Sequence, residues 1–425
     1  MTLEERAFRK ATRRLIPFLF LIYVVAYLDR VNVSLSFAQL QLEEDLDFSD
    51  TIFGIGAGIF SLGYVIFGVP SNLALARFGA RRWLAAIMVA WGLISASMMF
   101  IEGPASFYVL RFLLGAAEAG FFPGIILFLT WWFPERERTP ALALFLTAVS
   151  VAYVFGGPIS GGLLELDSFA GLHGWQWLFL IEGMPAIALG FVTLRFLDER
   201  PNEAEWLEPE ERDFLVAEVR REHELRERLG PERVRDALAN ARVWEFGLVN
   251  FVLLAAGFGL TFFVPDLVQD RTGYSDFEVG LLAAIPFAFA TAAMIAASRR
   301  PGGLAPLMAT GAAGTIITAY AQSPLLLTLG ITLAAVGLLA ALPRFWIGPT
   351  ALLGGTAAAA GIALVAVLGN LGGFVGPAFT GIAKDQTGGY EMPLVTLGLI
   401  LLACALLTTL GLARRSEAQA QPVRR

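Results

Sequence analysis

Ionisable side chains stand inside long apolar stretches at two places in the first third of the chain. Asp29 and Arg30 follow an apolar run that begins at Leu15, and Arg111 and Glu118 lie seven residues apart in another. An arginine keeps its positive charge even when it is removed from water, so it could hold an anion there. A buried carboxyl group could instead gain and lose a proton near neutral pH. These residue types therefore suggest anion binding next to proton binding.

Helical geometry would place these groups on defined faces. At about 100° per residue, Tyr27 and Arg30 share one face, while Asp29 lies on the next. Two interpretations remain open. In the first, Asp29 and Arg111 neutralise one another and only stabilise the packing, and Arg30 and Glu118 could do the same. In the second, an arginine binds an anionic substrate and a carboxylate takes up a proton, so that the two fluxes are coupled.

The last third of the chain holds fewer such groups. Arg344 lies deep in an apolar stretch, close to Trp346, and implies a wet cavity or a neighbouring anion. Asn370 could make either a helix–helix hydrogen bond or a contact with a substrate. Asp266 lies near the end of an apolar stretch, where we expect it to be solvated.

The elements that carry these residues are expected to be membrane helices. Of the 425 residues, 56% are hydrophobic and 16% are charged, whereas a soluble domain has about a quarter charged residues. The apolar residues form uninterrupted blocks, which suits lipid, where a helix satisfies its own backbone. A bilayer needs about 20 apolar residues per helix. On this basis we predict spans at 15–37, 52–76, 83–101, 107–133, 141–164, 175–197, 244–268, 277–297, 304–321, 325–352, 357–383 and 393–412.

The charges of the connections predict the topology. Lys and Arg gather in both tails and in alternate connections, and the opposite connections are mostly acidic or neutral. The positive-inside rule then places both termini in the cytoplasm. Segment 198–242 is rich in Glu and Arg with apolar residues at helical spacing, which is typical of a solvated amphipathic linker. We predict an all-α membrane protein with an N-terminal six-helix bundle (1–197), a cytoplasmic linker loop (198–242) and a C-terminal six-helix bundle (243–425).

A short repeat favours two related halves. The Gly-Gly-Pro run at 156–158, in the fifth predicted span, is similar to the Gly-Pro pair at 376–377 in the eleventh. Corresponding interrupted helices are typical of transporters built from repeats, with the binding site near the middle of the membrane.

Signals for other chemistry are missing from the sequence. It contains no P-loop, no His/Cys/Asp metal spacing, no Ser-His-Asp combination outside the spans, and a single cysteine, Cys404. We therefore expect a protein that is not an enzyme, binds no cofactor, metal or nucleic acid, and uses an ion gradient. A monomer in the lipid bilayer is the expected state.

Several longer motifs resemble those of a known family. They read YLDRVNV (27–33), VPSN (69–72), RFGARRW (77–83), RFLLGAAEAGFFPG (111–124), GWQWLF (174–179) and GNLGGFVGP (369–377). Together they resemble the anion:cation symporter branch of the major facilitator superfamily over nearly the whole chain. The bacterial members that the chain resembles most take up tartrate, phthalate, sugar acids such as galactonate, or hydroxyphenylacetate.

The resemblance implies the major facilitator fold, with twelve transmembrane helices in two pseudo-symmetric bundles, and proton-coupled import of a small organic anion across the inner membrane by alternating access. The residues expected to line the substrate pocket are Tyr27, Arg30, Tyr64 and Asn370, to which we add Arg344 and Trp346. The residues expected to carry or balance protons are Asp29, Glu118 and Arg111.

Three departures from the family pattern bear on the substrate. Val365-Ala366-Val367 replaces polar residues, Gly257-Phe258-Gly259 stands where relatives often carry a tyrosine, and Arg344 replaces a neutral residue. These changes favour a compact or aromatic carboxylate, or a dianion, over a polyhydroxy acid. Two alternatives remain: a proton antiporter that exports cationic drugs, and a transport-fold sensor that binds a ligand without moving it.

Overall fold

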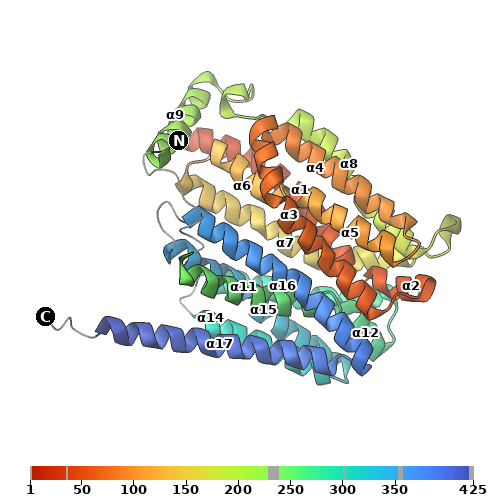
Figure 1. The fold of residues 1–425 in the computed structure, drawn as a ribbon. Helices are drawn as coiled ribbons and strands as arrows, with labels where there is room; N and C mark the ends of the chain where they lie inside the picture. Colours follow the sequence, from red (N-terminus) through yellow and green to blue (C-terminus); the bar gives the residue numbers. More distant parts are fainter. Residues whose placement is uncertain (1, 35–36, 228–238, 300–302, 353–357, 421–425) are drawn as a thin grey trace. The chain divides into compact units, whose positions relative to one another are not determined.

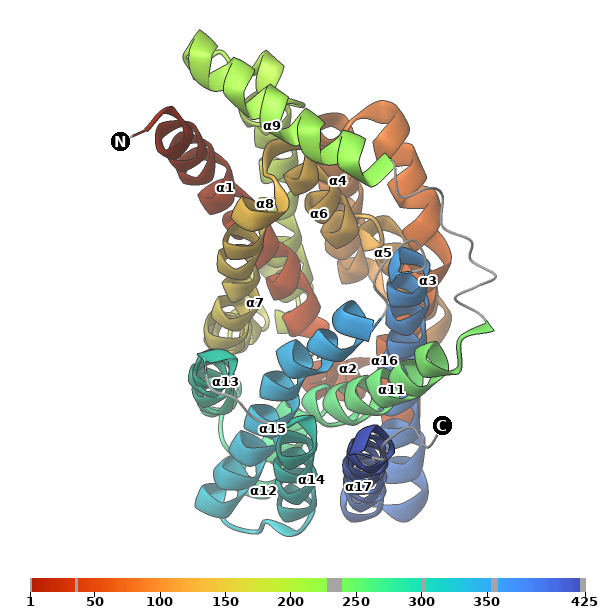
Figure 2. The ribbon, with the colours of Figure 1, turned by 90° about the vertical axis from the view of Figure 1, so that its left-hand side faces the viewer.

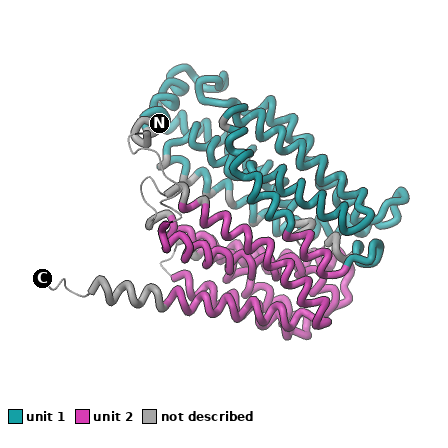
Figure 3. The backbone as a smooth tube through the Cα atoms, viewed as in Figure 1, with its two compact units in different colours: residues 1–33, 37–48, 59–232 teal, residues 34–36, 49–58, 233–425 magenta. Residues whose placement is uncertain are grey.

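A computed structural model of the chain describes residues 2–34, 37–227, 239–299, 303–352 and 358–420. Within these ranges every regular element is a helix, which confirms the all-α prediction. The chain forms two compact units (Figure 3). Unit 1 contains residues 1–33, 37–48 and 59–232, and unit 2 contains residues 34–36, 49–58 and 233–425. The boundaries predicted for the two bundles and the linker stay a prediction.

The predicted spans correspond to helices of the described residues. Eleven helical stretches there are long and apolar enough to cross a membrane, and Leu304–Tyr320 is a shorter apolar helix. Two predicted spans are broken. The span at 107–133 consists of α5 (Pro104–Glu118) and α6 (Phe121–Trp132), and the span at 244–268 consists of α11 (Ala241–Thr261) and α12 (Val264–Thr272).

Unit 1 is a bundle of long helices joined by short connections (Figure 1). Besides α5 and α6 its helices are α1 (Leu3–Ser34), α2 (Phe37–Leu46), α3 (Asp50–Phe78, of which 50–58 belongs to unit 2), α4 (Ala80–Ser97), α7 (Glu135–Leu164), α8 (Gly174–Phe196) and α9 (Pro209–Glu227). α4 packs along α8. A Cβ atom on Gly92 or Gly183 would lie 2.7 Å from the carbonyl oxygen of the other residue, so the two backbones touch only because both positions are glycine.

Unit 2 is also a bundle of helices that pack along one another. Besides α11 and α12 it contains α13 (Asp276–Arg299), α14 (Leu304–Tyr320), α15 (Pro324–Leu352), α16 (Ala358–Thr387) and α17 (Glu391–Ala420). α11 packs along α16, and α14 packs against both α15 and α17 (Figure 2). Its apolar core includes Leu253, Phe345 and Leu401. Asn250 of α11 donates to the carbonyl oxygen of Val365 in α16 at 3.1 Å, so a side-chain hydrogen bond joins these two helices.

The segment around α9 lies on unit 1 through an apolar face. Leu207 and Leu215 are buried, and the Phe214 ring lies 5.9 Å from the ring of Phe8 in α1. Lys10 of α1 donates to the Glu211 carboxylate at 2.8 Å. The pKa of Glu211 is lowered, because its hydrogen bonds with Lys10 and with the Glu208 amide outweigh the opposing effect of desolvation. α9 is therefore held to α1 by packing and by one ion pair.

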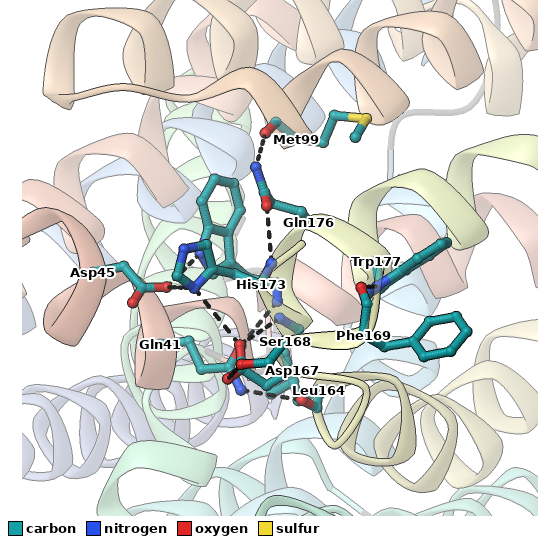
Figure 4. A network of polar contacts seen from close by, with 12 residues as sticks. Gln41, Asp45, Met99, Leu164, Asp167, Ser168, Phe169, His173, Gln176 and Trp177 are labelled. Atoms are coloured by element: carbon teal, nitrogen blue, oxygen red, sulfur yellow. Dashed lines mark hydrogen bonds and ion pairs between the residues drawn. The ribbon is translucent and has the colours of Figure 1, made fainter. Parts of the chain in front are cut away.

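A polar network joins α2 to the connection between α7 and α8 (Figure 4). His173 lies 2.9 Å from the Asp45 carboxylate and 3.6 Å from that of Asp167. The Gln41 side-chain oxygen accepts from the Trp175 amide at 2.9 Å, and its NH2 group donates to a backbone carbonyl of α7 at 3.2 Å. The short helix α2 is thereby fixed to the bundle by side chains.

Candidate functional site

The site in unit 1 begins with a close approach of α3 and α5. A Cβ atom on Gly115 of α5 would overlap the carbonyl of Phe60 in α3, and one on Gly63 would overlap the carbonyl of Phe112. Small residues allow helices to approach in this way. The contact places Phe60 and Tyr64 of α3 beside the charged residues of α5.

Arg30 of α1 pairs with Glu118 of α5. Its Nε donates to Glu118 Oε2 at 2.7 Å. The Arg30 side chain is 23% exposed, whereas that of Glu118 is only 1% exposed, so the pair has one accessible and one inaccessible member. The Arg30–Glu118 pair, one of the pairings considered from the sequence, is therefore present in the structure.

Aromatic rings surround the guanidinium of Arg30. Its central carbon lies 5.3 Å from the ring centroid of Tyr27, 5.2 Å from that of Phe60 and 5.1 Å from that of Tyr64. Ring faces attract a cation at these distances and give it a partly apolar environment. Tyr27 and Tyr64, both expected in the pocket, thus lie at Arg30.

Glu118 carries an unused acceptor. Its Oε1 is buried and has no hydrogen-bond partner among the described residues. Arg111, 2% exposed, lies over the Phe60 ring at 5.1 Å, and its charge acts on Glu118 together with that of Arg30. A buried carboxylate oxygen without a donor is unfavourable, and a proton on the carboxyl group would relieve it.

Asp29 is held by α4. Trp91 Nε1 donates to Asp29 Oδ2 and Ser95 Oγ donates to Oδ1, each at 2.7 Å, and Asp29 is 1% exposed. Both carboxylate oxygens of Asp29 thus accept a hydrogen bond from α4. The sequence suggested Arg111 as the partner of Asp29 and did not point to Trp91 or Ser95. The four-residue spacing of Trp91 and Ser95 puts them on one helix face, which is the only signal that could have pointed to them.

A second layer of tyrosines extends from Tyr27. The rings of Tyr23 and Tyr27 lie 4.9 Å apart, and the ring of Tyr153 in α7 lies 6.3 Å from that of Tyr27. Tyr23 also stacks on Phe145 of α7 at 4.3 Å. These contacts fix the side of α1 that carries Arg30 against α7. Nothing in the sequence singled out Tyr153.

The remaining predicted residues belong to unit 2. Arg344 is half-buried in α15. Trp346 packs against the apolar core, with its ring 5.2 Å from that of Phe345. Asn370 donates to the Ala366 carbonyl of its own helix at 2.9 Å. Six predicted residues thus gather in unit 1, and these three lie in unit 2 at separate points of α15 and α16.

Asp266 is buried in an ionic cluster, so the expectation that it is solvated is wrong. Lys384 of α16 donates to Asp266 at 2.6 Å and to Asp50, the first residue of α3, at 2.8 Å. The hydroxyl of Tyr390 also donates to Asp266, which is 8% exposed. The break between α11 and α12 turns Asp266 toward α16. Asp50 and Tyr390 were missed, because the four residues of this cluster come from distant parts of the chain.

Comparison with known proteins shows which family the chain resembles. Residues 19–360 match the model of the Major Facilitator Superfamily. A "Putative tartrate transporter" of Agrobacterium vitis is 46% identical over 421 residues, covering 97% of this chain and 93% of that protein. A quinolone resistance transporter of Acinetobacter baumannii is 37% identical over 100% of this chain and 99% of that protein. The inner membrane transport protein RhmT of Escherichia coli is 36% identical, covering 98% of both chains.

Solved structures with the same fold have much lower identity. A bacterial homologue of the human lysosomal transporter Spinster superposes with a TM-score of 0.74 at 18% identity, covering 93% of this chain and 96% of that one. A D-xylose–proton symporter gives a TM-score of 0.72 at 14% identity, covering 92% and 96%. These likenesses concern the fold alone.

Proposed function

The chain belongs to the Major Facilitator Superfamily, and we propose that it takes up a small organic carboxylate together with protons by alternating access. It is a multi-pass secondary transporter of the inner membrane and not an enzyme. The proposal of proton-coupled carboxylate uptake rests on one observation. Arg30 is ion-paired with Glu118, and the second oxygen of Glu118 is buried without a hydrogen-bond partner among the described residues.

The first step is the binding of the anion at Arg30. A guanidinium has five N–H donors, and its planar fork matches a carboxylate. The pair with Glu118 uses the Nε group. Tyr27, Phe60 and Tyr64 surround the guanidinium with ring faces, which suits an aromatic or compact substrate.

The second step couples the anion to a proton. When a substrate carboxylate replaces Glu118 as the ion-pair partner of Arg30, the buried Glu118 carboxylate loses its main counter-charge. A proton then neutralises Glu118. Conversely, a proton on Glu118 releases Arg30 for the anion. By linkage each ligand then favours the binding of the other, which is the requirement for symport.

Asp29 and Arg111 complete the proposal in unit 1. Asp29 is a second proton site, held in place by Trp91 and Ser95. Arg111 is a fixed positive charge that keeps the group near neutrality while Glu118 changes its protonation. Arg344, Trp346 and Asn370 of unit 2 stay proposed substrate contacts.

The name of the Agrobacterium relative supports a hydroxydicarboxylate as the first substrate to try. The experiment uses purified full-length protein in liposomes that contain a pH-sensitive dye. Tartrate, phthalate, galactonate, hydroxyphenylacetate and glutamate are added outside in turn. We expect acidification with at least one of them, its loss in Glu118→Gln, and weaker uptake in Arg30→Lys, which keeps the charge but not the fork. Binding of a panel member without flux would point to exchange or sensing.

A second candidate function is proton-driven export of a drug, which the quinolone resistance relative favours. Asp29 and Glu118 could serve a cationic substrate, but Arg30 and Arg111 would repel it. The same liposomes distinguish the two. Export predicts that a quinolone raises the internal pH of acid-loaded vesicles and that the five anions of the panel have no effect.

A further inference from the structure

A cleft at the N-terminal end of α1 joins positive charge to an apolar surface. It has a volume of about 640 Å3. Its lining residues are Lys10, Arg13, Arg14, Pro17, Phe18, Leu21, Phe196 and Trp206. All of them belong to unit 1, and none takes part in the proposed transport chemistry.

The lining residues of α1 form one continuous helix face. They stand at positions 10, 13, 14, 17, 18 and 21, so each has another lining residue three or four positions away, which is the spacing of neighbours on a helix surface. The first three are cations and the rest are apolar. Over about 16 Å along the helix axis, the face thus changes from positively charged to apolar. This order is complementary to an anionic phospholipid, which has a negatively charged headgroup followed by apolar chains.

The three cations differ in how they are held. Lys10 pairs with Glu211 at 2.8 Å. The Arg14 guanidinium lies 4.7 Å from the Phe196 ring and 5.1 Å from the Trp206 ring, and its Nε is buried without a hydrogen-bond partner among the described residues. Arg13 is exposed. The cleft therefore offers two guanidinium groups, one of them with an unused buried donor.

The walls of the cleft hold Arg14 in place and continue into an apolar surface. Phe18 of α1 stacks on Phe196 of α8 at 4.5 Å, and Trp206 donates to the Asp198 carboxylate at 2.6 Å. Leu21 is 46% exposed and Leu194 of α8 is 42% exposed. In a membrane these side chains contact lipid tails, so the cleft opens toward the bilayer.

We propose that this cleft binds the headgroup of an anionic phospholipid. Arg13 and Arg14 hold the phosphate, since guanidinium groups bind phosphate oxygens by paired hydrogen bonds. The acyl chains lie along Pro17 and Leu21. The positive-inside pattern places this end of α1 at the cytoplasmic leaflet, whose anionic lipids attract basic residues at helix ends. The bound lipid would stabilise the junction where the segment before α9 meets α1 and α8.

Native mass spectrometry of the detergent-released full-length protein tests the proposal. It is titrated with phosphatidylglycerol and, in parallel, with phosphatidylcholine. We expect retained phosphatidylglycerol adducts and far fewer phosphatidylcholine adducts. Each removed cation should weaken phosphatidylglycerol binding about fivefold, so Arg13→Gln loses about fivefold and Arg13→Gln with Arg14→Gln about 25-fold. Arg13→Gln alone changes an exposed side chain, so folding is not at stake.

Arg9→Gln is the matched control, because Arg9 is exposed on the same helix and does not line the cleft. It removes the same charge and should leave binding unchanged. An equal loss in Arg9→Gln would reduce the effect to general charge attraction and overturn the site. Equal retention of the two lipids would also overturn it. Displacement by soluble glycerol phosphate at the same concentration would assign the cleft to a soluble anion instead. The readout involves no transport, so it is independent of the proposed function.

Discussion

Unit 1 and unit 2 each bury a group of charges, and the two groups are built differently. In unit 1, Arg30 and Glu118 form an ion pair, and one oxygen of Glu118 has no hydrogen-bond partner among the described residues. In unit 2, Lys384 bridges two carboxylates, Asp50 and Asp266, and Asp266 also accepts from Tyr390.

This difference indicates which of these charged groups can exchange an ionic partner for a proton. A cation that bridges two carboxylates is held from two sides, and its removal leaves two negative charges together, of which that of Asp266 is buried. Such a cluster suits a fixed tie between helices. A carboxylate with one partner and one unused oxygen can exchange that partner for a proton at lower cost. The Arg30–Glu118 pair of unit 1 therefore suits transport, and the Lys384 cluster of unit 2 suits a structural role.

The largest effect should follow from removing the titratable group of unit 1. Glu118→Gln keeps an acceptor for Arg30 but cannot be protonated, so we expect proton-coupled uptake to fall to background. Substrate exchange across the membrane should persist, because it needs no net proton movement. Counterflow and dye acidification, measured in the same liposomes, separate the two. Undiminished acidification in this variant would show that the proton site lies elsewhere.

The matching change in unit 2 should act on stability. Lys384→Met leaves Asp50 and Asp266 without their shared cation, and breaking such a buried group should lower the unfolding free energy by about 3 kcal/mol. Thermal unfolding in detergent measures it. Adding Asp266→Asn should recover part of the loss. If Glu118→Gln proves equally destabilising, the distinction between the two groups fails.

The packing behind the site in unit 1 can be broken without touching a charge. Gly115→Val places a branched side chain against the Phe60 carbonyl and should cost about 1–3 kcal/mol through the forced separation of α3 and α5. Uptake should fall as well, because Phe60 and Tyr64 move away from Arg30. Gly103→Ala is the control, since a Cβ atom there meets nothing within 4 Å. Thermal unfolding and uptake are compared for both variants.

The smallest effect concerns an ion pair outside both groups. The pKa of Glu211 lies below its ordinary value of 4.5 in the folded protein. A lowered folded-state pKa stabilises the protein above pH 4.5, and this contribution is lost as the pH falls through the folded-state value. Because Lys10 is 44% exposed, we expect less than about 1 kcal/mol. Tryptophan fluorescence, with Trp206 close to α9, should report the acid transition, and Glu211→Gln should remove this pH dependence.

Much of the fold could be predicted from the sequence, because each helix must satisfy its backbone and match the bilayer by itself. The predicted span at 325–352 agrees with α15 to one residue at its start. The breaks near Gly120 and Phe263 were missed, since they interrupt apolar stretches without changing their composition.

The sequence by itself determined which residues carry charge inside the membrane, because a charge in a long apolar stretch stands out without knowledge of its neighbours. Only the tertiary structure decided their partners. Helical periodicity gives the face on which Asp29 or Arg30 lies, but not the rotation of α1 against α4 and α5. That rotation follows from contacts that α1 makes with segments far away in the chain, such as Tyr23 stacked on Phe145 of α7. It is why Asp29 meets Trp91 and Arg30 meets Glu118. In unit 2, packing between distant segments likewise decides that Asp266 meets Lys384.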